Sequence, residues 1–147
     1  MRISTKGRYG LRILLDVASH EKNGPVALRD ISRRQAISQK YLWQVINPLK
    51  VSGLLRATRG AHGGYMLAKP AKRITVHDIV DILEGPVSIV ACVQEPGSCG
   101  RSATCTARDA WSEIEARLNE AMQGITLQHL LERQEEQNRR HAPGYDI

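Results

Sequence analysis

Hydrophobic and polar positions in the first half of the chain predict three helices followed by a β-hairpin. Residues 5–21 carry apolar side chains around most of the helical circumference, which is typical of a helix buried among others. Residues 28–35 and 39–51 have apolar positions at helical spacing. Two short strands are expected at residues 54–58 and 65–68, because the connector between them holds three glycines and can turn tightly.

The pattern changes after residue 70. Thr75 and Asp78 have the spacing of a capping box and open a helix that Gly85 ends. Residues 86–104 are rich in proline, glycine and cysteine and predict an irregular loop. A long helix then begins at Cys105 or the next residue. Its apolar residues recur at alternating steps of four and three, as in a helix-pairing seam: Ala107, Trp111, Ile114, Leu118, Ala121 or Met122, and Ile125.

The expected fold class is mainly α with a small β-hairpin, namely a winged helix-turn-helix plus a long dimerisation helix. Residues 1–73 would form the winged helix-turn-helix, and residues 74–136 would hold the cysteine loop and the dimerisation helices. A last helix is expected from Thr126 to about Glu135, and residues 137–147 read as a disordered tail. The seam alone fits pairing within one monomer equally well, but so long a helix in so small a protein favours a homodimer.

Bulk properties place the chain among cytoplasmic globular proteins. Its 147 residues are 41% hydrophobic, which is enough to bury a core. Its apolar runs fall short of the roughly 18 residues that a membrane span needs, and its first residues lack the pattern of a signal peptide. We therefore expect a cytoplasmic protein that has no membrane partner.

Charge is distributed unevenly along the chain. Residues 1–73 carry fifteen Lys and Arg against three Asp and Glu, a balance of +12. Residues 74–147 carry six against twelve, a balance of −6. A basic first half favours a polyanionic partner, although a solvated basic face would give the same count.

The predicted third helix and the hairpin carry the residues expected to meet double-stranded DNA. An α-helix fits the major groove, where Gln and Asn suit adenine edges and Lys suits phosphate or guanine. A glycine-tipped wing can enter the minor groove. The candidate DNA-binding residues are Arg2, Ser38, Gln39, Lys40, Tyr41, Trp43, Gln44, Arg59, Gly60 and His62, with Lys6, Arg8 and Asn47 as further contacts.

All three cysteines fall within fourteen residues, as Cys92, Cys99 and Cys105. An odd, clustered set in a cytoplasmic protein favours metal or redox chemistry over a disulfide framework. Thiolates are preferred ligands of zinc, copper(I) and iron–sulfur clusters, and the spacing is not that of a zinc-finger knuckle. Three unrelated free thiols would be the unremarkable alternative.

Catalytic motifs do not favour an enzyme. The sequence contains no nucleophile elbow, no phosphate-binding loop of the Walker type and no zinc-protease helix motif. Its five histidines are scattered along the chain. We therefore expect neither catalysis nor a small-molecule substrate.

Several of these segments together resemble the iron–sulfur-sensing bacterial regulators of the IscR type, within the Rrf-type winged-helix superfamily. The resemblance covers about residues 1–135 and is most specific in the first seventy residues and the cysteine loop. It rests on Met1–Tyr9, Ile31-Ser32, Tyr41-Leu42, Gly53-Leu54, Arg59-Gly60, Gly63-Gly64-Tyr65 and the three cysteines. It implies a homodimeric transcriptional regulator in which Cys92, Cys99 and Cys105 ligate an iron–sulfur cluster, with the helix from Ser38 and Arg59 on DNA.

Two positions depart from the IscR type. Arg108 stands where that type has its histidine ligand, and a guanidinium cannot serve in its place. The fourth ligand is then open among Asp109, a distant histidine, a partner-subunit residue, and an exogenous thiol or water. A 2Fe–2S cluster is favoured and a 4Fe–4S cluster is possible. Trp43 stands where that type has a glutamate that helps to discriminate operators, so the target sequence is not implied.

The sequence therefore predicts a DNA-binding transcriptional regulator whose promoter affinity is controlled by an iron–sulfur cluster. The first alternative keeps DNA binding and makes the cysteines a thiol redox switch or a zinc site. A more distant alternative is a partner-binding structural module without DNA affinity.

Overall fold

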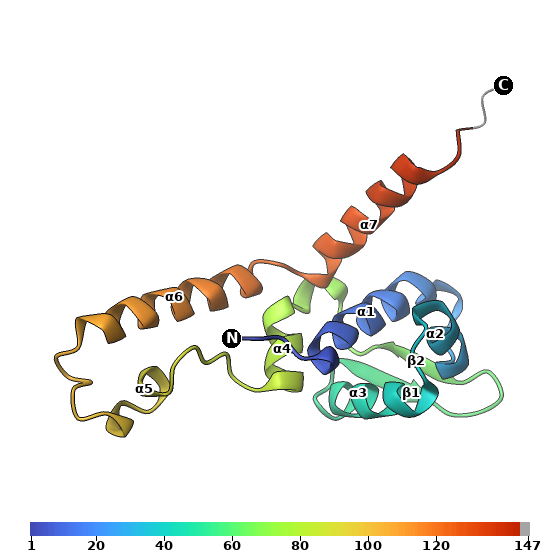
Figure 1. The fold of residues 1–147 in the computed structure, drawn as a ribbon. Coiled ribbons are helices and arrows are strands. Elements are labelled where there is room, and N and C mark those ends of the chain that lie inside the picture. The colour runs from blue at the N-terminus through green and yellow to red at the C-terminus, as the bar shows by residue number, and fades with distance from the viewer. Residues whose placement is uncertain (145–147) are drawn as a thin grey trace.

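The structure, a computed structural model, describes residues 1–144 and consists of a compact head, a projecting arm and a final helix (Figure 1). The head begins with three helices and a two-stranded sheet. Short 3₁₀ turns η1 (Glu21–Asn23) and η2 (Ala71–Arg73) follow α1 and β2. The bounds are α1 Thr5–His20, α2 Leu28–Gln35, α3 Gln39–Val51, β1 Leu55–Thr58 and β2 Gly64–Leu67. The three predicted helices and the hairpin are confirmed, each strand lying one residue from its expected range.

Local capping explains why α2 and α3 form a helix-turn-helix. The α2 helix ends at Ala36, whose backbone is left-handed with φ of 53°, and the Ser32 hydroxyl donates to the Ile37 carbonyl at 2.6 Å. Two residues after that turn, Ser38 opens α3, its hydroxyl accepting from the Tyr41 amide at 3.2 Å. Short-range hydrogen bonds thus fix both ends of the turn.

The hairpin is antiparallel, with Leu55 paired to Leu67 and Thr58 to Gly64. Val26 extends it by one isolated bridge, because its amide and carbonyl both bond Tyr65, at 2.9 and 2.8 Å. The approach is so close that a Cβ on Gly64 would lie 2.3 Å from the Val26 carbonyl oxygen. The segment before α2 therefore anchors the base of the wing.

The hydrophobic core does not stop at residue 73. It includes Ile74, Ile79 and Leu83 of the following segment and Leu127 near the end of the chain. Helix α4 (Val76–Glu84) opens with the predicted capping box and packs on α1 and α3. Residues 74–84 thus pack into the same core as the first three helices.

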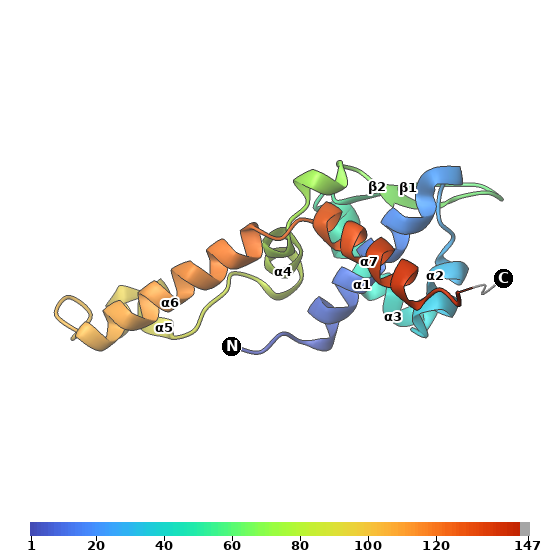
Figure 2. The same cartoon turned by 90° about the horizontal axis from the view of Figure 1, so that it is seen from above.

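The arm consists of residues 86–105, which we call the cysteine segment, and α6 (Thr106–Gln123). The two run side by side away from the head in both views (Figures 1 and 2). The expected irregular loop contains a short helix α5 (Ala91–Gln94) and a 3₁₀ turn η3 (Pro96–Ser98). Helix α6 ends at Gln123, before the Ile125 of the predicted seam. The chain then returns to the head, where the Ile125 carbonyl accepts from the Val76 amide at 2.9 Å.

The final helix α7 (Leu127–His141) passes over α1, as the view from above shows (Figure 2). It is longer than the sequence suggested, since it continues beyond Glu135 through residues assigned to a disordered tail. Arg140 pairs with Glu136 one turn earlier, which supports the added turn. Residues 145–147 of that expected tail lie outside the described residues. Among residues 1–144, no helix is long and apolar enough to cross a membrane.

Candidate DNA interface and cysteine segment

The exposed face of α3 gathers about half of the residues predicted to meet DNA. Leu42, Val45, Ile46 and Leu49 are buried and fix the helix on the core. The opposite face is exposed and carries Ser38, Gln39, Lys40, Trp43, Gln44 and Asn47. Tyr41 is different, because it is half-buried and its ring meets Tyr9 edge-on with centroids 5.7 Å apart. The face is largely polar, and Trp43 is its aromatic side chain, with the exposed Val51 at the end of the helix.

The tip of the wing carries the other predicted contacts. Arg59, Gly60 and His62 are exposed there, and Gly60 has a φ of 114°. A Cβ on Gly63 would lie 2.2 Å from the Thr58 carbonyl oxygen, so the tip closes only with glycine. Arg2 is exposed and precedes α1, and the N-terminal end of the chain lies away from the hairpin tip (Figures 1 and 2).

A buried carboxylate holds α2 against α1. Asp16 is 3% exposed and accepts from Arg34 Nη2 at 2.7 Å, from Arg34 Nε at 3.0 Å and from Gln35 Nε2 at 2.8 Å. Burial alone would raise the pKa of Asp16, but these hydrogen bonds and the charges of Arg34 and His20 hold it below its ordinary value. Sequence reasoning missed this pair, although an aspartate within an otherwise apolar stretch of α1 was a visible signal.

The last residue of α4 caps the first turn of α1. Glu84 Oε1 accepts from the Ser4 and Gly7 amides, each at 3.0 Å, and from the Ser4 hydroxyl. The two helices approach closely because α1 presents glycines there: a Cβ on Gly10 would lie 2.1 Å from Leu83 Cδ1. Glu84 thus joins the N-terminal end of the head directly to the point where the cysteine segment begins. Nothing in the sequence pattern indicated this contact.

The three cysteines occupy different environments. Cys92, on α5, and Cys105 are half-buried, whereas Cys99 is exposed, and all three are free thiols. Cys105 is the N-cap of α6, and its sulfur accepts from the Arg108 amide at 3.4 Å. A helix N-terminus favours a thiolate at that position.

Arg108 connects two of these cysteines. Besides its amide bond to the Cys105 sulfur, its Nε donates to the Cys92 carbonyl oxygen at 2.8 Å. The Ile89 amide also donates to Glu115 Oε2 at 3.1 Å, which fastens the segment to α6 a second time. The residue that replaces a histidine ligand in the resemblance therefore serves as a structural tether here.

The donor chemistry of the segment fits an iron–sulfur cluster, because three thiols are available close together in sequence. Within residues 1–144, however, no three His, Cys, Asp or Glu side chains are grouped closely enough to hold a metal ion. A Cβ added at Gly97 or Gly100 would meet no atom within 4 Å, so the chain on either side of Cys99 is not closely packed there. Binding would require the segment to close around the ligand.

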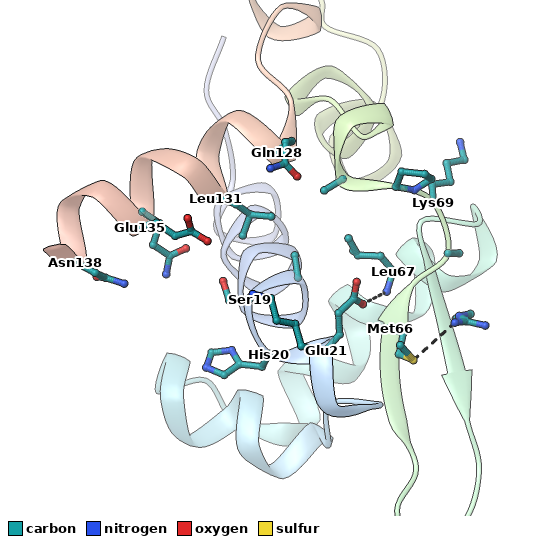
Figure 3. A pocket seen from close by; sticks show the side chains of 17 residues that line it. Ser19, His20, Glu21, Met66, Leu67, Lys69, Gln128, Leu131, Glu135 and Asn138 are labelled. Atoms are coloured by element: carbon teal, nitrogen blue, oxygen red, sulfur yellow. Dashed lines mark hydrogen bonds between the residues drawn. The ribbon is translucent and has the colours of Figure 1, made fainter.

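A wide hollow lies between α7, the end of α1 and β2 (Figure 3). Its lining is largely polar, with His20, Lys69, Gln128 and Glu135 among the side chains, and Glu21 Oε2 accepts from the Leu67 amide at 2.7 Å. The hollow contains none of the predicted site residues. The Glu21–Leu67 hydrogen bond ties β2 to the turn η1 that follows α1.

The chain matches known transcriptional regulators over most of its length. The profile of the Rrf2 family, described as iron-dependent transcriptional regulators, matches residues 3–133. The protein rrf2 of Nitratidesulfovibrio vulgaris is 41% identical over 131 residues, covering 89% of this chain and 87% of that protein. CymR of Bacillus subtilis is 40% identical over 114 residues (78% and 83%), and IscR of Cronobacter sakazakii is 38% identical over 135 residues (92% and 83%).

Solved structures agree with these matches. IscR of T. potens superposes with a TM-score of 0.77 at 34% identity and covers 99% of this chain and 95% of its own. CymR of B. subtilis, described as the global cysteine regulator, gives a TM-score of 0.73 at 36% identity and covers 90% and 97%. The matched proteins are regulators rather than enzymes, and they differ in the signal that their names suggest.

Proposed function

Because the chain belongs to the Rrf2 family of transcriptional regulators, we propose that it is a homodimeric cytoplasmic regulator whose promoter affinity is set by an iron–sulfur cluster on Cys92, Cys99 and Cys105. The family makes it a DNA-binding transcriptional regulator. The signal, the ligand set and the assembly are the proposal. The observation that carries it is the cysteine segment, with two of its cysteines tied together by Arg108 at the start of α6.

Most of the predicted DNA contacts fall on two surfaces, the exposed face of α3 and the tip of the wing, whereas Arg2 precedes α1. We assign the polar residues of α3 to the major groove and Arg59, Gly60 and His62 to the minor groove or its phosphates. The +12 balance of residues 1–73 supports this assignment, since each phosphate contact releases condensed counterions.

Helix α6 supports a homodimer. It has 18 residues, none of them buried, and Trp111 and Ile114 on the predicted seam are 43% and 46% exposed. An amphipathic helix with its apolar stripe uncovered gains stability when a second copy covers that stripe.

Cysteine chemistry and the contacts of the segment suggest how a signal would reach DNA. A bound cluster would supply a redox-sensitive and iron-dependent link between the cysteines. Closing the segment around a ligand would pull on residues 85–91, which follow Glu84 directly. Glu84 caps α1, so its displacement would weaken its hydrogen bonds to Ser4 and Gly7 and would shift the nearby Arg2. We propose this path as the coupling between the two sites.

Anaerobic purification tests the cluster. The full-length protein should be coloured and contain iron and acid-labile sulfide, and Cys92→Ala, Cys99→Ala and Cys105→Ala should each abolish the absorbance while leaving the helical circular dichroism unchanged. Ser98→Ala, next to Cys99, is the matched control and should keep the colour. A colourless protein that takes up no iron on reconstitution would reject the cluster.

Salt-dependent DNA binding tests the interface. Arg59→Ala and Lys40→Ala should each weaken duplex binding and reduce the slope of log affinity against log salt by about 1. Arg117→Ala, an exposed arginine on α6, should leave both unchanged. If both head variants bound like the wild type, the groove assignment would be wrong.

A thiol switch is the second candidate. The separation of the exposed Cys99 from its half-buried partners and the likeness to the cysteine regulator CymR favour it. It predicts that iron-free protein changes its DNA affinity when treated with a disulfide-forming oxidant and recovers with dithiothreitol. Under the cluster proposal, iron-free protein responds to neither treatment.

A further inference from the structure

Trp43 is the aromatic side chain on the exposed face of α3. Trp43 is 53% exposed, whereas Leu42 and Val45, which are close to it in the same helix, are fully buried. Its neighbours one turn away, Lys40 and Asn47, are exposed and polar. The ring therefore stands in the middle of the surface that faces away from the core.

The orientation of this ring is restrained. Lys50, two turns further along α3, places its Nζ 5.6 Å from the centroid of the Trp43 ring, within the range of a cation–π contact. Lys50 itself is half-buried and lies in the last turn of α3. A restrained aromatic ring can recognise a neighbour at lower entropic cost than a free one.

Charge decides which kind of partner fits this ring. Residues 1–73 carry a balance of +12, and the side chains around Trp43 include Lys40, Lys50 and polar amides. A nucleic-acid duplex matches such a surround, and its major groove offers one apolar group at the base edges, the 5-methyl of thymine. Resting on the assignment of α3 to the major groove, we propose that Trp43 determines operator specificity by packing against thymine methyl groups.

Replacing thymine by deoxyuridine isolates this contact, because it removes the methyl and leaves every hydrogen-bonding group. The full-length protein would first enrich duplexes from a random-sequence library, and each thymine of the best duplex would then be changed singly to deoxyuridine. Wild-type binding should weaken about fourfold at one or two positions, the effect of one buried methyl group. Trp43→Ala should bind the thymine and deoxyuridine duplexes equally at those positions.

Two variants separate this role from general DNA affinity. Trp43→Phe keeps an apolar ring and should retain the sensitivity to the methyl group. Lys40→Ala should bind more weakly to every duplex but keep the fourfold difference. A Trp43→Ala protein with the wild-type penalty, or a wild type with no penalty at any thymine, would overturn the proposal. Failure of the wild type to enrich any duplex would instead overturn DNA recognition by α3, and this inference with it.

Discussion

Asp16 and Arg34 show how one charged pair positions the recognition unit. The carboxylate is buried between α1 and the end of α2, where Arg34 and Gln35 supply its hydrogen bonds. Arg34 also has a raised pKa, chiefly because it donates to Asp16, so both groups stay charged together. A buried charge without its partner is costly, and α2 leads directly into the turn that sets α3.

Removing Arg34 should therefore destabilise the head. Arg34→Met leaves Asp16 buried and unpaired and should lower the free energy of unfolding by about 3 kcal/mol at pH 7, measured by urea denaturation. Arg33→Met is the matched control: Arg33 makes only an exposed pair with Asp30 at 3.7 Å, so its loss should cost at most about 0.5 kcal/mol. Equal losses in the two variants would contradict the role given to the buried pair.

The same pair predicts a pH dependence. Because the folded-state pKa of Asp16 lies below its ordinary value of 3.8, its stabilisation is present above that value and is lost as pH falls through the folded pKa. The stability difference between wild type and Arg34→Met should therefore shrink at acidic pH. A difference that stays constant from neutral pH to the acid transition would argue against a charged Asp16.

At the scale of elements, the contact between α1 and α4 connects the two halves of the molecule. Gly7 and Gly10 remove side-chain bulk from one face of α1, and Glu84 then reaches the free amides of its first turn. A helix start has unpaired amides that need acceptors, and here the acceptor comes from a helix about eighty residues later. The contact therefore joins the first turn of α1 to the end of α4, the helix that precedes the cysteine segment.

Glu84→Ala should remove this cap. We expect a loss of about 1–2 kcal/mol in the free energy of unfolding, the usual effect of deleting a helix cap, and faster amide hydrogen exchange at Ser4 and Gly7. Asp81→Ala, one turn earlier on α4 and exposed, should change neither. If exchange at Gly7 were unaltered in Glu84→Ala, the contact would not be the link between α4 and α1.

At the scale of the whole molecule, the arm is the part whose apolar residues Trp111 and Ile114 stay exposed in the single chain. The head has a continuous core, whereas α6 extends away from it with its apolar stripe exposed (Figure 1). Two heads joined through such an arm would bind two half-sites of one DNA duplex together, which raises the overall affinity without any new base contact.

A charge on the seam should separate the two copies. Trp111→Glu is expected to sediment as a monomer in analytical ultracentrifugation and to bind a two-half-site duplex at least about a hundredfold more weakly, because the linked second binding event is lost. Ser112→Glu introduces the same charge at the neighbouring exposed position, off the stripe, and should remain dimeric. A dimeric Trp111→Glu protein would place the subunit contact elsewhere.

The sequence by itself determined the features that depend on neighbouring residues. Periodicity and caps such as Ser38 and Thr75 gave the helices of the head, and the glycines gave the hairpin, because these signals act within a turn or two. They also brought the predicted DNA contacts of α3 onto one face. The length of α7 was underestimated because its polar final turns lack an apolar period and depend on local charge pairing instead.

Only the tertiary structure decided how distant segments meet. It showed that α4 and Leu127 complete the core of the head, that Glu84 caps α1, and that Arg34 neutralises Asp16. It also showed that Arg108 ties Cys92 to Cys105 while Cys99 stays exposed. Such contacts join side chains far apart in the sequence, and their energy comes from burial and geometry that exist only once the chain has folded, so no local pattern could have revealed them.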